Sequence, residues 1–71
     1  MKERIYKTMV QRYTSEIEDA LLKIDLLLVN AGSGSVMVNH TDITGEVNKY
    51  LARAASSSER LTLLRKFYSN N

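Results

Sequence analysis

The segment that decides the fold is residues 30–44, Asn-Ala-Gly-Ser-Gly-Ser-Val-Met-Val-Asn-His-Thr-Asp-Ile-Thr, because the residues on both sides have the pattern of helices and this segment does not. It holds two of the three glycines, Gly32 and Gly34, and the third, Gly45, follows directly. Glycine adopts left-handed backbone conformations at little cost, and serine competes for backbone hydrogen bonds. The sequence therefore predicts two helical arms that reverse direction at a turn containing these three glycines.

The residues before the turn have the pattern of one long helix. Apolar side chains recur at intervals of three and four residues, the spacing of one buried helical face, and predict a helix over about 3–28. They are Ile5, Tyr6, Met9, Val10, Tyr13, Ile17, Ala20, Leu21, Ile24, Leu27 and Leu28. Ser15 and Glu18 have the spacing of a capping box, so a separate helix could begin there after a bend. Residues 25–29 fit either the last helical turns or a short buried strand.

A short β element is expected at the Gly/Ser joint, which spans about 30–43. Residues 36–38, Val-Met-Val, favour an extended conformation because valine is β-branched. If residues 25–29 are also extended, the two runs form a hairpin, and so small a ribbon would have to lie on the helices. The fold class is therefore mainly α, with α+β left open.

The helical pattern resumes after the joint, over about 45–68. Its apolar residues are Val47, Tyr50, Leu51, Ala54, Ala55, Leu61, Leu64, Phe67 and Tyr68. Three serines at 56–58 leave a gap in this pattern. Its phase continues across them, which fits one helix, but Ser56 and Glu59 repeat the spacing of a capping box, so two short helices fit equally well. Two long arms with a short joint should run antiparallel, as a helical hairpin within a single small domain over 1–71.

The composition points to association with other proteins. A domain of 71 residues buries only about 60% of the surface of its unfolded chain. No cysteine is present, so neither a disulfide nor a cysteine-bound metal can stabilise the fold. We therefore expect a homo-oligomer, which could be a ring. The start of the chain has no signal-peptide pattern, and the longest apolar run, 26–29, is far too short to span a membrane.

Charge is distributed unevenly along the chain. The formal net charge is +2, but residues 1–12 carry +3, residues 49–71 carry +4, and the residues between them carry −5. In an antiparallel hairpin the two basic ends meet at one pole, where contact with a nucleic acid backbone is conceivable. The nearby aromatic residues fall on the apolar faces, so a protein-binding surface is favoured over nucleic acid.

The sequence offers little for catalysis. His40 and Asp42 lie close together in the chain, but no third metal ligand stands at motif spacing, so His40 is interpreted as an ordinary turn residue. Residues 32–35, Gly-Ser-Gly-Ser, share only composition with a phosphate-binding loop, because no Gly-Lys-Ser/Thr follows. We predict no catalytic residue, no cofactor and no metal, and hence no enzyme.

Three short runs resemble a known family: Val-Met-Val at 36–38, Thr-Asp-Ile-Thr at 41–44, and Val-Asn-Lys-Tyr-Leu-Ala at 47–52. This order is similar to the gpW family of head completion proteins of tailed phages, in which a strand runs into a Ser/Thr cap and a helix. The resemblance implies a helix, a β-hairpin and a second helix. It also implies a structural protein of the virion that binds the portal ring after DNA packaging and forms the platform for the tail or neck.

The leading expectation is therefore a non-enzymatic head-tail connector subunit with portal or neck proteins as partners. The alternative is a small helical binding module of the cytoplasm, such as a secretion co-chaperone or a regulator that pairs with a partner helix, and a small DNA-binding regulator ranks third. The candidate partner-binding residues belong to a segment that is apolar over more than one stripe: Leu61, Leu64, Arg65, Lys66, Phe67 and Tyr68. The same segment could instead close the protein's own core.

Overall fold

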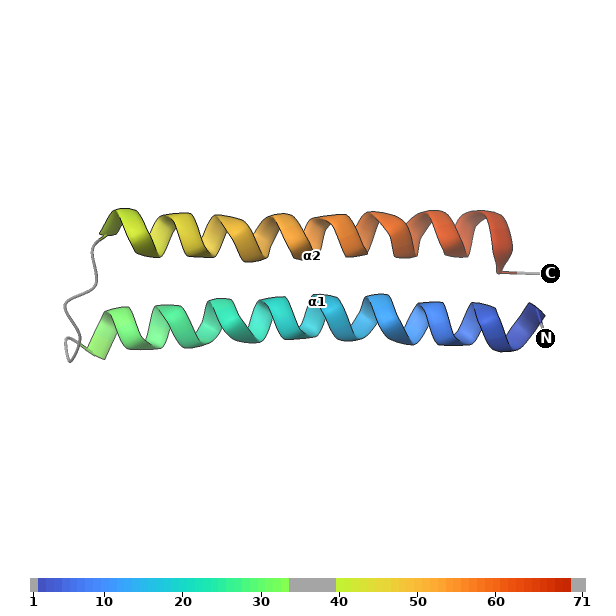
Figure 1. The fold of residues 1–71 in the computed structure, drawn as a ribbon, viewed down its shortest axis with the longest axis horizontal. Coiled ribbons are helices and arrows are strands. Elements are labelled where there is room, and N and C mark those ends of the chain that lie inside the picture. Colours follow the sequence, from blue (N-terminus) through green and yellow to red (C-terminus); the bar gives the residue numbers. More distant parts are fainter. Residues whose placement is uncertain (1, 34–39, 70–71) are drawn as a thin grey trace.

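The computed structural model describes residues 2–33 and 40–69, without the side chains of 31–33, 40 and 41. This part of the chain forms two helices, α1 (Lys2–Ser33) and α2 (His40–Tyr68), and contains no strand. The helices lie side by side and antiparallel, so both chain ends are at the same pole (Figure 1). The molecule measures 51 × 16 × 12 Å. The predicted antiparallel helical hairpin is thus confirmed.

Helix α1 is longer than the sequence predicts. It continues past residue 28 to Ser33, so residues 25–29 are helical and do not form a strand. Leucine is a good helix former, and in the helix Leu27 stays in phase with the face that packs on α2. The chain passes Ser15 without interruption. The expected extended segment at 36–38 lies outside the described residues.

Helix α2 is one continuous helix rather than two. The serines at 56–58 are helical because Ser57 turns inward and keeps the buried face in phase. The prediction that Gly32 and Gly45 belong to the turn is wrong, since Gly32 lies in the last turn of α1 and Gly45 in the second turn of α2. A helix accepts glycine at a cost of about 1 kcal/mol, which favourable neighbours can offset. Gly34 lies outside the described residues.

The inward-facing residues of both helices follow a seven-residue repeat. They are buried or half-buried and alternate at intervals of four and three: Tyr6, Val10, Tyr13, Ile17, Ala20, Ile24 and Leu27 in α1, and Ile43, Val47, Tyr50, Ala54, Ser57, Leu61 and Leu64 in α2. A period of 3.5 residues is that of a coiled coil. The hairpin therefore has the pattern of an antiparallel two-stranded coiled coil, and among the side chains that the structure describes, all the buried ones lie in this seam.

The middle of the seam contains small side chains. Ala20 is fully buried, and Ala54 and Ser57 are nearly so. Their small size lets the two helices approach closely. In the part of the chain that the structure describes, no large side chain is fully buried. The core is consequently thin, and most of the apolar bulk lies outside it.

Candidate functional site

The seam divides the surface of the hairpin into two unlike sides. Beside the seam, one row of side chains repeats every seven residues, each directly before the inward-facing residue 17, 24, 47, 54 or 61. We call this row the charged side, because it holds Glu16, Lys23, Glu46, Arg53 and Arg60. On the other side of the seam a second row repeats every seven residues, each directly after the inward-facing residue 20, 27 or 50. We call this row the apolar side, because it holds Leu21, Leu28 and Leu51. In an antiparallel coiled coil these two kinds of position fall on opposite sides of the seam, with like positions of the two helices facing each other.

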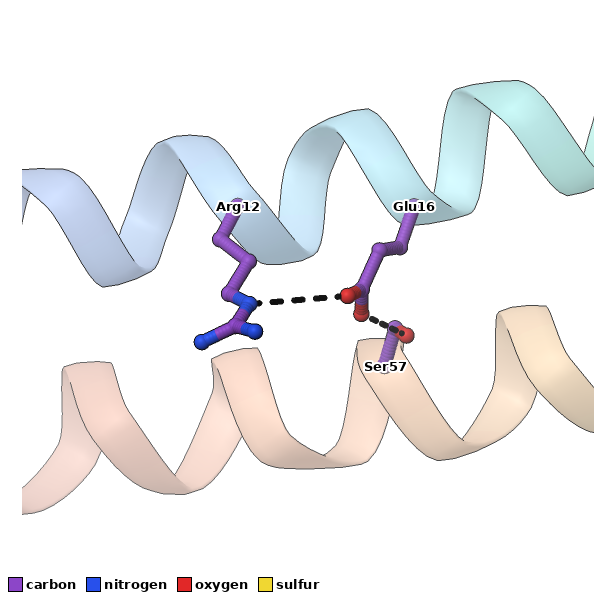
Figure 2. Close-up of polar contacts among 3 residues, drawn as sticks. All are labelled: Arg12, Glu16 and Ser57. Atoms are coloured by element: carbon purple, nitrogen blue, oxygen red, sulfur yellow. Dashed lines mark hydrogen bonds and ion pairs between the residues drawn. The ribbon is translucent and has the colours of Figure 1, made fainter.

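On the charged side a hydrogen bond joins the two helices (Figure 2). The Ser57 hydroxyl of α2 donates to Glu16 Oε1 of α1 over 2.9 Å. Arg12 Nε lies 3.7 Å from the other carboxylate oxygen, Oε2. Ser57 is only 3% exposed, so its hydroxyl needs a partner within the protein. The contact favours one register of α2 along α1, because a shift by one turn would separate the two groups.

Tyr50 is the centre of a second polar cluster on this side. Lys23 Nζ of α1 lies 5.6 Å from the centroid of the Tyr50 ring, Lys49 Nζ lies 5.4 Å from it, and Arg53 Cζ lies 5.3 Å from it. Cation–π contacts of this kind contribute about 0.5–1 kcal/mol each at exposed sites. Asp19 Oδ2 is 3.1 Å from Lys23 Nζ. The charged side therefore has many of its charges engaged within the hairpin.

Two hollows mark the surface. A shallow groove follows the charged side and is lined by Glu16, Asp19, Lys49, Ala52, Arg53, Ser56, Ser57 and Arg60. A second hollow lies at the pole with the chain ends and is lined by Lys2, Glu3, Tyr6, Lys7, Lys66, Phe67, Tyr68 and Ser69. The two basic ends thus meet at one pole, as the sequence predicts. The groove mixes charges of both signs, which is a poor match for a polyanion such as DNA.

Features of a chemical site are sparse in the described residues. Within 2–33 and 40–69, no three His, Cys, Asp or Glu side chains are grouped so that they could hold a metal ion. The side chain of His40 lies outside the described residues. Neither helix, over its described length, contains an apolar stretch long enough to cross a membrane. The predictions that the chain has no cofactor and is not an enzyme stay predictions.

The structure separates the predicted partner-binding residues into two groups. Leu61 is buried and Leu64 half-buried, and both face α1 as part of the seam. Arg65, Lys66, Phe67 and Tyr68 are exposed. The segment 61–68 therefore contributes its inner leucines to the protein's own core, and only its outer residues are free to meet a partner.

A larger exposed apolar surface lies elsewhere, in the second half of α1. Eight of the ten residues at 20–29 are apolar, but one helix face can bury only some of them. The exposed members are Leu21, Leu22, Leu26, Leu28 and Val29. A helix that is apolar on all sides is normally surrounded by protein. The run of leucines is visible in the sequence, so this signal was available without the structure.

The total accessible surface shows how much of the chain is left uncovered. It is 5682 Å², whereas a folded monomer of this mass exposes about 4,500 Å², which leaves an excess of about 1,200 Å². The radius of gyration is 16.1 Å, compared with about 11 Å for a compact domain of this length. No protein-family model matches the chain, and neither a curated protein nor a solved structure matches it.

Proposed function

We propose that this chain is a non-enzymatic assembly protein whose helical hairpin packs against helices of other protein subunits. One observation carries the proposal. Ten large hydrophobic side chains of the described residues are at least 45% exposed, although the protein has a thin core and would gain from burying them. Exposed apolar surface of this extent is typical of protein–protein interaction sites.

The energies involved support the same function. Burying one fully exposed leucine contributes about 1.5–3 kcal/mol, and the outward leucines are already about half buried, so covering each of them contributes about 0.8–1.5 kcal/mol. A chain of this length has a total stability of about 3.5–10 kcal/mol, since proteins gain about 0.05–0.15 kcal/mol per residue. Covering four of these leucines against a partner therefore contributes about 3–6 kcal/mol, which is comparable to the stability of the isolated hairpin. The free energy gained on association is then similar in size to the free energy of unfolding of the isolated hairpin.

The role of a phage connector subunit is a narrower form of this proposal. In this role the partners are portal or neck proteins, several copies of the chain form a ring, and the protein is located in the virion. Its support is the resemblance of residues 36–38, 41–44 and 47–52 to the gpW family. The first strand of that family's β-hairpin has no counterpart at 25–29, because these residues are helical.

The alternative form is a small cytoplasmic binding module that pairs with a partner's helix. The exposed apolar stripe of α1 supports it, because helix pairing needs apolar residues at helical spacing. Leu22, Leu26 and Val29 have that spacing and are all exposed.

Site-specific cross-linking in the cells that produce the protein tests the proposal. A photoreactive amino acid replaces Leu22 or Phe67, which are exposed and apolar, or Glu59, an exposed polar position that serves as the control. We expect protein adducts at Leu22 and Phe67 well above the level at Glu59. Adducts with a portal protein would support the connector form, and adducts with a helix of another protein would support the binding module. Equal, sparse adducts at all three positions would reject the proposal.

A further inference from the structure

We propose that the apolar side of the hairpin binds a second copy of this chain, so that two hairpins form a four-helix bundle. The inference rests on the proposed function, because it names the partner for part of the same exposed surface. It assigns the interface to Leu21, Leu28 and Leu51 and leaves the charged side facing solvent.

The first support is the position of the three leucines. Leu21 and Leu28 are seven residues apart in α1, and Leu51 holds the equivalent position in α2, directly after the inward-facing Tyr50, so all three lie in one row beside the seam. They are 45%, 54% and 50% exposed. Helices of a bundle need apolar residues at three of seven positions, the two of the seam and one beside it. The hairpin supplies this third row on one side only.

The rest of that row is also suited to burial. Toward the chain ends it continues with Thr14 in α1 and Ser58 in α2, which are small and uncharged. The charged residues of this row are Lys7 and Arg65, which lie one step of seven residues closer to the chain ends than Thr14 and Ser58. We place the two-fold axis between Leu21 and Leu28, so that the α1 helices of the two copies run antiparallel to each other. Lys7 of each copy then lies beyond the end of the other copy's α1. The basic ends are then outside the overlap and stay in water.

The charged side is a poor alternative as the buried face. Its carboxylate at Glu16 and its cations at Lys23 and Arg53 already contact groups within the hairpin. Burying these groups under a second copy would remove their water without adding a partner, and the desolvation of a charge costs several kcal/mol. Burial under a second copy would therefore remove water from charged groups on the charged side but from leucines on the apolar side. For this reason we assign the interface to the apolar side.

A second copy of the chain is large enough to cover most of the surface that the hairpin exposes in excess of a compact monomer. The chain exposes about 1,200 Å² more surface than a compact monomer of its mass. A standard interface buries about 800 Å² on each partner. One further hairpin therefore covers most of the excess. A two-fold contact also places leucines against leucines in both copies at once, because the same patch is used twice.

The exposed leucines allow two matched comparisons. Leu26 and Leu28 are both 54% exposed and lie two residues apart in α1, but only Leu28 is on the apolar side. Leu51 and Leu63 are both 50% exposed in α2, and only Leu51 is on the apolar side. Replacing each in turn by alanine keeps the helix propensity high and removes the same amount of apolar side chain.

Sedimentation equilibrium of the full chain and of the four variants measures the outcome. We expect the parent at twice its mass of 8.1 kDa. Leu28→Ala and Leu51→Ala should raise the dissociation constant by about 10- to 100-fold, and Leu26→Ala and Leu63→Ala by less than about threefold. Circular dichroism at the same concentrations records helix content, so that dissociation is followed whether or not the separated hairpins stay helical.

Three results would overturn the dimer: a parent that is monomeric at every concentration, an assembly larger than two chains, or equal effects within each matched pair. A monomeric parent that still forms adducts at Leu22 and Phe67 leaves the proposed function standing with a different partner. A monomeric parent without such adducts rejects both.

Discussion

The hydrogen bond between Ser57 and Glu16 predicts unequal effects of one substitution at adjacent positions. We expect Ser57→Ala to make the hairpin less stable than Ser56→Ala does. Ser57 is buried in the seam and donates to Glu16 Oε1, whereas Ser56 is exposed on the outside of α2. Both variants lose the same hydroxyl and gain the same alanine, so their difference isolates the contact across the seam.

The size of the difference follows from the burial of the two groups. A hydrogen bond to a charged group contributes about 1.5–3 kcal/mol. The Glu16 side chain is 41% exposed, so water replaces the lost donor, and we expect a cost nearer 1 kcal/mol. Alanine is a better helix former than serine by about 0.5 kcal/mol, a gain that both variants share. Ser56→Ala should therefore be stabilising by about 0.5 kcal/mol and Ser57→Ala destabilising by a similar amount.

Thermal unfolding at one fixed protein concentration checks this prediction, because association changes the apparent stability. A difference of about 1 kcal/mol corresponds to roughly 4–8 °C in Tm for a domain of this size. Repeating both substitutions in a Glu16→Ala background should abolish the difference, as expected for a double-mutant cycle. Equal melting temperatures in the parent background would show that the hydroxyl does not stabilise the seam.

Three further substitutions test the helical backbone, the narrow seam and the aromatic cluster. Gly45→Ala should stabilise the chain by about 0.5–1 kcal/mol in thermal unfolding, since Gly45 is helical and an added Cβ meets nothing within 4 Å; a loss would place Gly45 in a non-helical conformation. Ala54→Leu should destabilise by about 1–3 kcal/mol through overpacking, whereas Ala52→Leu at an exposed position should be nearly neutral, and equal effects would contradict a close-packed seam. Tyr50→Leu should cost about 1.5–3 kcal/mol in urea unfolding, because it removes three cation–π contacts of about 0.5–1 kcal/mol each. Tyr50→Phe should cost almost nothing, because phenylalanine keeps the ring face that the cations approach; equal losses in the two variants would show that the hydroxyl, and not the ring, stabilises the protein.

The helical arms were predictable because their apolar spacing extends over many turns. The boundaries of the joint were not, and the error has a physical cause. The conformational freedom of glycine predicts that Gly32 and Gly45 belong to the turn, yet both are helical. The helical penalty of one glycine is about 1 kcal/mol, and each lies next to turns whose inward residues pack on the other helix. Tertiary packing therefore extended both helices into the Gly/Ser segment.

The serines at 56–58 show a second limit of local pattern. The apolar residues on both sides, Ala54 and Leu61, are in phase with Ser57, but a serine carries no apolar signal of burial, and a capping box at Ser56 fits the local sequence equally well. The group that accepts its hydrogen bond, Glu16, is 41 residues away in the chain. A contact at that separation becomes visible only when the two helices are placed side by side. The continuous α2 then brings Leu61 and Leu64 into the seam, where the sequence left a partner interface and the protein's own core as alternatives.

The distribution of large and small side chains bears on why the hairpin has such a thin core. A two-helix protein that had to be stable alone would place its largest apolar residues in the seam, where each contributes most. This chain does the reverse around the middle of α1, where the buried position holds Ala20 and the next two positions, Leu21 and Leu22, are about half exposed. Small inward residues bring the helices together, and large outward residues remain available to another surface. This arrangement supports the proposal that the hairpin completes its core against a partner.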